Sequence, residues 1–263
     1  MNLLDDSMNI TKLAIPGSHD SCTFEFENKG FLNPIYYFFG QTQSWNLYDQ
    51  LISGIRYLDI RVSGDGNIYH GIAKTKSTFS GVFEIITNFL NKYQSEGLIM
   101  RVKFERRKCN GLYSQCLRDK VIKIFNKYND FIYDSGIVPN VGDLRGKIYL
   151  ITDNFRYKDY LIWDEENFAL QDFYDLNGMK KIEIKKKKDL VYEYLYKKTD
   201  QLIINHCSGV GQAAMTDIKY VSYKVNEIPY INKNYTGILP IDFPGEELIS
   251  YIIDINLKFN ITE

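Results

Sequence analysis

The sequence of 263 residues predicts one α/β domain spanning residues 1–263, folded as a distorted or incomplete TIM (β/α)8 barrel. The first observation is that short apolar runs of β type alternate with helical stretches, as in sheets of parallel strands. The second is that polar and charged residues stand at or just past the predicted strand ends, where barrel active sites are built. The third is a polar segment over residues 155–195 without a clear period, which argues against an ideal barrel.

The predicted elements follow one another in chain order. Strands are expected over residues 13–15, 55–62, 68–70, 98–104, 147–152, 202–205 and 237–242. Helices are expected over residues 45–53, 79–94 and 116–128. Turn signals follow the first two strands, Pro16-Gly17 after the first and the run from Ser63 to Gly66 after the second. The residues at or past strand ends are His19, Arg61, His70, Lys103, Asp153, Asn205 and Asp242.

The composition argues against several classes of partner and location. The formal net charge is -1, so there is no basic field that would favour nucleic acid as a partner. Lysines gather at 180–181 and 185–188 among acidic residues, and we expect them on a solvated helix or loop face. No apolar run is as long as a transmembrane helix, and the first residues lack the basic start and apolar stretch of a signal peptide.

The four cysteines, Cys22, Cys109, Cys116 and Cys207, have none of the spacings of a zinc site. Free thiols and any of the possible disulfide pairings are compatible with the sequence. The redox compartment therefore stays open at this point.

Two of the three histidines, His19 and His70, flank a predicted strand that carries Asp59 and Arg61. Histidine titrates near neutrality, so two of them at one phosphate can act as base and acid in the same turnover. An arginine between them can bind the phosphate through a bidentate fork without a metal. Carboxylates that could hold the imidazoles in their working tautomers are Asp20, Asp59 and Asp242. The alternative is that both are ordinary loop histidines, and the third, His206, is expected to be structural or at the rim.

The run from Ile15 to Phe24, IPGSHDSCTF, is followed by Asp59-Ile60-Arg61 and then by His70-Gly71. Together these motifs resemble the X domain of bacterial phosphatidylinositol-specific phospholipase C. Shorter pieces extend the resemblance over most of the chain, at 33–35, 40–43, 99–103, Glu105, 144–148, 171–174, 203–205 and 241–242. The resemblance implies an irregular TIM barrel that cleaves phosphatidylinositol to diacylglycerol and inositol 1,2-cyclic phosphate.

The same resemblance implies a role for each catalytic residue. His19 would take the proton from the inositol 2-hydroxyl, whose oxygen attacks phosphorus, and His70 would protonate the departing diacylglycerol oxygen. Asp242 would orient His19. Asp20 would pair with His70, and Arg61 would neutralise the phosphate. Calcium-dependent relatives place a metal ion where Arg61 stands, so we expect neither a metal nor another cofactor.

Substrate recognition by resemblance falls on Lys103, Asp172 and Tyr174, and Asp59 and Asn205 are further candidates for substrate contact. Lys103 and Asp172 would bind ring hydroxyls, with a surface ion pair as the alternative, and Tyr174 would lie against the sugar. Relatives carry an inositol-binding arginine near the end of the fourth strand, where this chain has Asp153. Arg156 is a candidate substitute, so headgroup specificity stays open.

The run Ile35, Tyr36, Tyr37, Phe38 and Phe39 is the expected membrane contact. In the family this segment is a short helix at the barrel rim, and aromatic side chains favour the membrane interface. In an ordinary soluble domain the run would be core. The expected partner is phosphatidylinositol in a membrane, bound by a monomer. Export of bacterial relatives favours a secreted protein, with a cytoplasmic location as the alternative because no signal peptide is visible.

Two other functions fit part of the pattern. Glycerophosphodiester phosphodiesterases are barrels with two histidines, but they need a metal and acids on the second strand, where this chain has Arg61. An inactive lipid-binding module would not need the full set of histidines, arginine and acids.

Overall fold

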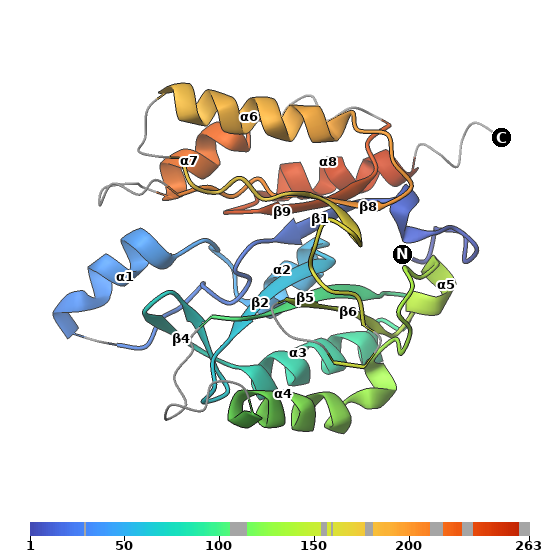
Figure 1. The fold of residues 1–263 in the computed structure, drawn as a ribbon, viewed down its shortest axis with the longest axis horizontal. Coiled ribbons are helices and arrows are strands. Elements are labelled where there is room, and N and C mark those ends of the chain that lie inside the picture. The colour runs from blue at the N-terminus through green and yellow to red at the C-terminus, as the bar shows by residue number, and fades with distance from the viewer. Residues whose placement is uncertain are drawn as a thin grey trace.

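In the computed structural model, parallel strands form a curved sheet at the centre of the molecule (Figure 1). The structure describes residues 1–28, 30–105, 115–153, 157–158, 160–176, 181–210, 218–227 and 234–257. The parallel strands, in the order in which they pair, are β6 Ile148–Asp153, β5 Leu98–Phe104, β2 Tyr57–Val62, β1 Ala14–Ser18, β9 Gly237–Ile241, β8 Leu202–Asn205 and β7 Phe168–Gln171. The antiparallel hairpin β3 Asn67–His70 and β4 Ala73–Thr78 branches from the end of β2.

The barrel is not closed by a strand ladder between β6 and β7. Within the described residues, the nearest contact of this kind is one parallel bridge between Thr152, on β6, and Ile162. This open seam confirms the prediction of a distorted or incomplete barrel, and the described part contains seven parallel strands rather than eight.

Helices cover the outer surface of the sheet in two groups (Figure 1). The helices α6 Lys181–Leu195, α7 Ile218–Val225 and α8 Glu246–Leu257 lie over one half. The helices α3 Phe79–Lys92 and α4 Gln115–Lys127 lie over the other half. The remaining helices are α1 Asn33–Gly40, which projects from the body, α2 Leu47–Ser53, α5 Val141–Leu144 and the 3-10 turns η1 Ile10–Lys12, η2 Gly30–Leu32 and η3 Asn129–Phe131.

Alternation along β2 determines which side chains enter the barrel. Tyr57 belongs to the interior cluster, whereas Leu58 and Ile60 pack outward against α3. Because successive side chains of a strand point to opposite faces, Asp59 and Arg61 share the inward face with Tyr57. The same rule applies on β5 and β6, so charged residues stack above an apolar floor. That floor includes Ile15, Ile99, Ile151, Ile204 and Ile238.

The segment over residues 155–195 differs from its prediction as irregular. It contains β7 and the 15-residue helix α6. On α6 the buried residues Ile184, Val191 and Leu195 share their face with a lysine, Lys187, which is also fully buried. The expectation that all lysines of this run are solvated is therefore wrong for Lys187, and the lysine also hid the amphipathic period of the helix. The prediction also missed β4, α7 and α8, whereas the short helix expected from the resemblance around residues 35–39 is present as α1.

The described cysteines Cys22 and Cys207 are buried free thiols. Burial raises the pKa of each to about 12, so both stay protonated near neutrality. Among the described helices, none has the length and apolar character needed to cross a bilayer.

The end of α2 offers a test of the packing of α2 against α8. Gly54 has φ 110°, and a Cβ at this position would lie 2.5 Å from Cδ1 of Ile253. We predict that Gly54→Ala lowers the free energy of unfolding by about 2 kcal/mol in urea titrations, because both backbone and packing are strained. The control Gly245→Ala adds a Cβ that meets no atom within 4 Å and leaves stability nearly unchanged. Equal stability of the two variants would contradict this packing.

Candidate active site

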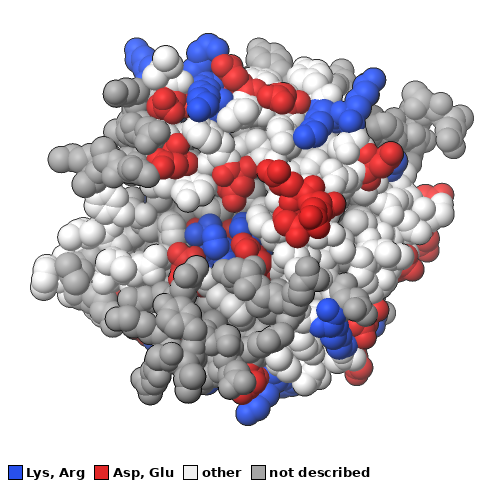
Figure 2. Space-filling model, viewed as in Figure 1, with Lys and Arg blue, Asp and Glu red and all other residues white. Residues whose placement is uncertain are grey.

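The predicted catalytic residues meet at the carboxyl ends of the strands. His19 follows β1, Asp242 follows β9, Arg61 lies near the end of β2 and His70 ends β3. Arg61 is in register with Lys103 of β5, which is in register with Asp153 of β6. Figure 2 shows a hollow on this face of the molecule in which basic and acidic side chains lie side by side.

His19 is held at both ring nitrogens. Its Nδ1 lies 2.7 Å from Oδ1 of Asp242, and its Nε2 lies 2.7 Å from Nη2 of Arg61. The side chain of Gln43 donates to the carbonyl oxygens of His19 and of Ile241, at 2.7 and 3.0 Å, which fixes the end of β1 against β9. Burial opposes a charge on His19, but the carboxylates of Asp242 and Asp20 outweigh it and raise the pKa of the imidazole.

Asp20 is the carboxylate around which Arg61 and the two imidazoles gather. Its Oδ1 lies 2.5 Å from Nε of Arg61, and its Oδ2 lies 3.3 Å from Nε2 of His70 and 3.5 Å from Nε2 of His19. The residue has φ 44°, in the left-handed region that few non-glycine residues adopt. Hydrogen bonds to its carbonyl oxygen from the hydroxyls of Thr23 and Thr42 stabilise this backbone conformation.

His70 is oriented by the backbone of α1. Its Nδ1 lies 2.7 Å from the carbonyl oxygen of Gly40. A carbonyl oxygen can only accept, so Nδ1 carries a proton and Nε2 faces Asp20. The next amide, that of Gly71, donates to Glu105 at 2.8 Å, and the other carboxylate oxygen of Glu105 lies 3.7 Å from Nη1 of Arg61. Glu105 is thus a site residue to which the sequence reasoning assigned no role, although it stood in a matching motif.

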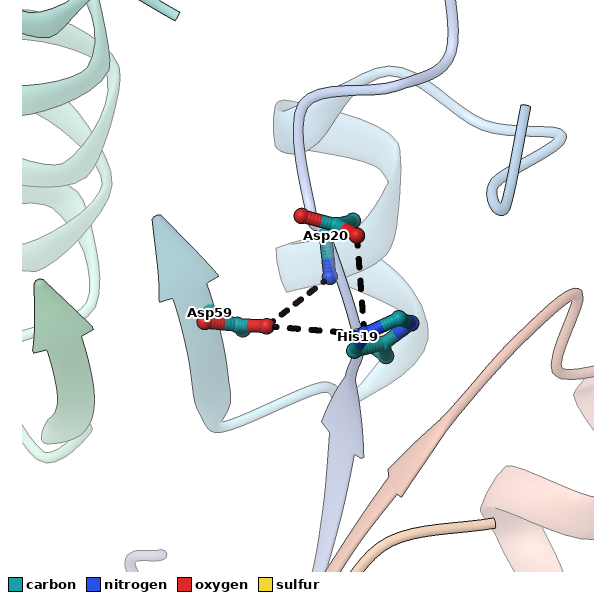
Figure 3. Close-up of side chains that lie close together, drawn as sticks. All are labelled: His19, Asp20 and Asp59. Carbon is teal, nitrogen blue, oxygen red and sulfur yellow. Dashed lines mark hydrogen bonds and ion pairs between the residues drawn. The ribbon is translucent and has the colours of Figure 1, made fainter. Parts of the chain in front are cut away.

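His19, Asp20 and Asp59 form a group whose donor atoms lie within 4.8 Å of one another (Figure 3). By donor type, such a group could hold a divalent cation. The guanidinium of Arg61 contacts all three, at 2.7 Å, 2.5 Å and 3.4 Å respectively. Burial opposes the charge on this arginine, but Asp20 and Asp59 raise its pKa, so it stays a cation. The chain itself therefore supplies the positive charge in this group.

Asp59 holds two arginines and does not face the pocket. It is fully buried, with Oδ2 3.4 Å from Nη2 of Arg61 and Oδ1 3.7 Å from Nη1 of Arg101. Burial opposes its charge, but Arg101 and Arg61 hold the pKa of the carboxyl well below its usual range. The expectation that Asp59 contacts substrate is corrected here, because its oxygens are covered by the two guanidinium groups.

Asn205 also lies away from the pocket. Its side chain is fully buried, donates to the carbonyl oxygen of Val191 on α6 at 2.9 Å, and accepts from Gln171 at 2.8 Å. The expected substrate contact is therefore wrong, because the strand alternation points this amide toward the helix layer. The described pocket candidates that retain exposed surface are Lys103, Asp172 and Tyr174.

Position 153, where relatives carry an inositol-binding arginine, holds an aspartate that pairs with an arginine of the neighbouring strand. The carboxylate of Asp153 accepts from Nη2 and Nε of Arg101, at 2.5 and 3.2 Å. The guanidinium of Arg101 also lies over the ring of Trp163, 3.8 Å from its centroid. An arginine is thus present at this level of the barrel, but it comes from β5 and is buried. The candidate substitute Arg156 lies outside the described residues.

The third histidine, His206, packs beside His19. Its ring is fully buried and lies edge-on to His19, with centroids 5.6 Å apart, and to Trp163, with centroids 5.5 Å apart. Burial lowers its pKa to about 3, so it is a neutral aromatic group near pH 7. This agrees with the expectation of a structural histidine.

The chain is similar to known proteins over nearly its whole length. The family model for the phosphatidylinositol-specific phospholipase C X domain matches residues 14–155. A protein of Listeria monocytogenes named 1-phosphatidylinositol phosphodiesterase is 33% identical over 99% of this chain and 85% of its own length. A protein of the same name from Staphylococcus aureus is 25% identical over 97% of this chain and 93% of its own length.

Solved structures agree with these matches. The phosphatidylinositol-specific phospholipase C of Listeria monocytogenes superposes with a TM-score of 0.83 at 30% identity, over 97% of each chain. The enzyme of Staphylococcus aureus superposes with a TM-score of 0.77 at 21% identity, over 97% of this chain and 96% of its own, which supports the fold alone. Neither the metal-dependent phosphodiesterase nor the inactive module is favoured by these matches. The chain belongs to the phosphatidylinositol-specific phospholipase C X-domain family.

Proposed function

We propose that the protein cleaves phosphatidylinositol to diacylglycerol and inositol 1,2-cyclic phosphate. The observation that carries this proposal is the convergence of two imidazoles and one guanidinium on Asp20, at 3.5, 3.3 and 2.5 Å. A phosphodiester needs a base, an acid and a cation that stabilises its oxygens, and these three groups supply them.

His19 acts as the general base in the proposed reaction. Its Nδ1 donates to Asp242, so the neutral ring presents the lone pair of Nε2 toward the pocket. Nε2 takes the proton of the inositol 2-hydroxyl while that oxygen forms a bond to phosphorus. Attack by a hydroxyl of the same molecule has a high effective molarity, roughly 10⁵ M or more.

His70 acts as the general acid. The bond between phosphorus and the diacylglycerol oxygen breaks, and the proton on Nε2 of His70 passes to this oxygen. Asp20 stabilises the imidazolium before the transfer, because its Oδ2 lies 3.3 Å from Nε2. When water opens the cyclic ester, the two roles are reversed: His70 takes a proton from the water and His19 protonates the inositol 2-oxygen.

Arg61 neutralises the phosphate, and we propose that no metal is required. The guanidinium lies among the three groups that could hold a cation, and its five donors suit phosphate oxygens. In the ligand-free site it contacts Nε2 of His19 at 2.7 Å. Substrate binding therefore has to insert the 2-hydroxyl at this contact and turn the guanidinium toward the phosphate.

Headgroup contacts are proposed for Lys103, Asp172 and Tyr174. Lys103 follows the inward alternation of β5 and is in register with Arg61. The side chain of Asp172 is about one-third exposed, and Oδ1 lies 3.9 Å from Nδ1 of buried His206. Tyr174 is exposed and offers a flat apolar surface to a sugar ring.

Membrane contact is proposed for α1 and for Phe31, which lies in the 3-10 turn η2 just before α1 in the chain. Phe31, Ile35, Phe38 and Phe39 are exposed, whereas Tyr37 packs edge-on against Phe26 with centroids 5.3 Å apart. Exposed aromatic side chains on a projecting helix favour a lipid interface. Peripheral binding to the membrane by a monomer is part of this proposal.

Phosphorus NMR of phosphatidylinositol vesicles in EDTA tests the reaction. We predict a cyclic phosphate signal with the wild-type protein, because Arg61 replaces a metal. His19→Ala and His70→Ala should each lower the rate by about 10² or more, since each removes a proton-transfer group.

Vesicle binding of both histidine variants is the control and should match the wild type. Activity that is lost in EDTA and restored by calcium or magnesium would contradict metal independence. Near-wild-type turnover by either variant would show that the acid and base are assigned wrongly.

The pH profile tests the pairing of His19 with Asp242. Asp242→Asn keeps an acceptor for Nδ1 but removes the carboxylate charge that raises the pKa of His19. A base must be deprotonated, so the acid limb of kcat/KM should move to lower pH, while kcat should fall by about 10² or more. NMR titration of the His19 ring should show the same downward shift, and an unchanged acid limb would contradict this pairing.

The membrane assignment is tested with two exposed aromatic residues. Phe39→Ala should weaken binding to phosphatidylinositol vesicles by about 10-fold, because an apolar side chain leaves the interface. Its hydrolysis of soluble inositol 1,2-cyclic phosphate should stay unchanged. Tyr196→Ala, at an exposed position beyond α6, is the matched control and should bind vesicles normally. Equal losses on both substrates would place Phe39 in the core.

A further inference from the structure

A buried lysine on α6 has no part in the reaction described above. Lys187 is fully buried, and among the described lysines it alone falls in the buried class. It lies on the apolar face of the helix, together with Ile184, Val191 and Leu195. An ammonium group in such a place needs an explanation, because burial of a charge is costly.

The ammonium of Lys187 closes a hydrogen-bond network at the end of β7. Its Nζ donates to the carbonyl oxygen of Phe173 at 2.7 Å and to Oε1 of Gln171 at 3.2 Å. Oε1 of Gln171 also accepts from the amide of Phe173 at 2.8 Å. Nε2 of Gln171 donates to Oδ1 of Asn205 at 2.8 Å and to the carbonyl oxygen of His206 at 2.9 Å. The network thus ties α6 to the segment 171–174 and to the end of β8.

Stability alone does not account for this lysine. Its acceptors are neutral, and no described carboxylate lies within ion-pair distance of Nζ. Desolvation lowers the pKa of the ammonium to about 8, against the nearby charges of Asp172 and Asp242. A methionine of similar length would fill the same apolar face without this cost. What the lysine adds is a fixed position for the carbonyl group between Asp172 and Tyr174.

We propose that Lys187 is a positioning residue for headgroup recognition, which holds the segment 171–174 so that Asp172 and Tyr174 stay placed at the pocket. The inference rests on the proposed function, in which these two residues contact the inositol ring. Lys187 acts through them and touches neither the substrate nor the reacting atoms.

The groups that face Lys187 also define a pH dependence. They are Asp172 beyond β7, Cys207 beyond β8 and Asp242 beyond β9. The thiol has a pKa of about 12 and stays neutral, whereas an ionised carboxylate carries a negative charge and can only accept hydrogen bonds. The ammonium is present below about pH 8 and is lost above it, so raising the pH from 7 to 9 removes a positive charge beside Asp172.

The test compares Lys187→Met with Lys185→Met, an exposed lysine two residues earlier on α6. On soluble inositol 1,2-cyclic phosphate, Lys187→Met should raise KM by about 10-fold with little change in kcat, the effect expected for losing hydrogen bonds of a charged group. The inhibition constant of myo-inositol should rise equally. In the wild type this constant should rise between pH 7 and 9, and in Lys187→Met it should be flat. Lys185→Met should behave as the wild type.

Hydrogen exchange without substrate gives an independent measurement. Amides of the segment 171–174 should exchange faster in Lys187→Met than in Lys185→Met, while the thermal midpoint is not lowered. Lys187→Gln keeps a hydrogen-bond donor, so its KM should lie between those of Lys187→Met and the wild type. A wild-type KM for Lys187→Met would overturn the inference. A lower kcat and a higher KM together with a lower thermal midpoint would overturn it as well. Wild-type protein that cleaves no inositol phosphodiester would overturn the proposed function, and this inference with it.

Discussion

A chain of alternating buried charges is the constraint on which the site depends. It runs from Asp153 through Arg101, Asp59 and Arg61 to Asp20, where both imidazoles also meet. Each charge is expensive to bury alone, and each is stabilised by its neighbours. Removing one member leaves the next without its partner, so the arrangement tolerates little variation. A substrate phosphate enters a site whose cations are already placed.

Strand alternation builds this chain with few residues. On β2, Asp59 and Arg61 are two residues apart and therefore share the inward face. On β5, Arg101 and Lys103 repeat the spacing one strand away, in register with the first pair. The outward residues between them fill the layer beneath α3. The same short sequence thus supplies both the packing of the barrel and the electrostatics of the site.

Alternating β and α stretches with polar residues at the strand ends predicted the fold class, and the motifs around His19, Arg61 and His70 carried the resemblance to the family. The direction in which each side chain points was harder to predict from the sequence. Asn205 was expected in the pocket because it ends a strand, but the alternation of β8 points it to α6. The helix itself was missed because Lys187 interrupts its apolar face, and only tertiary contacts identify the lysine as buried. A linear pattern records polarity but not which partners will satisfy it.

The pairing of β1 with β9 has a consequence for how the protein is made. Ala14 to Ser18 find their partners at Gly237 to Ile241, and the imidazole of His19 meets a carboxylate 223 positions later. Contacts of such separation form late, because most of the chain must be ordered to bring them together. During synthesis the side chain of His19 therefore stays unoriented until β9 has left the ribosome. Synthesis of β9 and Asp242 and orientation of the His19 ring are thus coupled, so a nascent chain that ends before β9 has no correctly held His19.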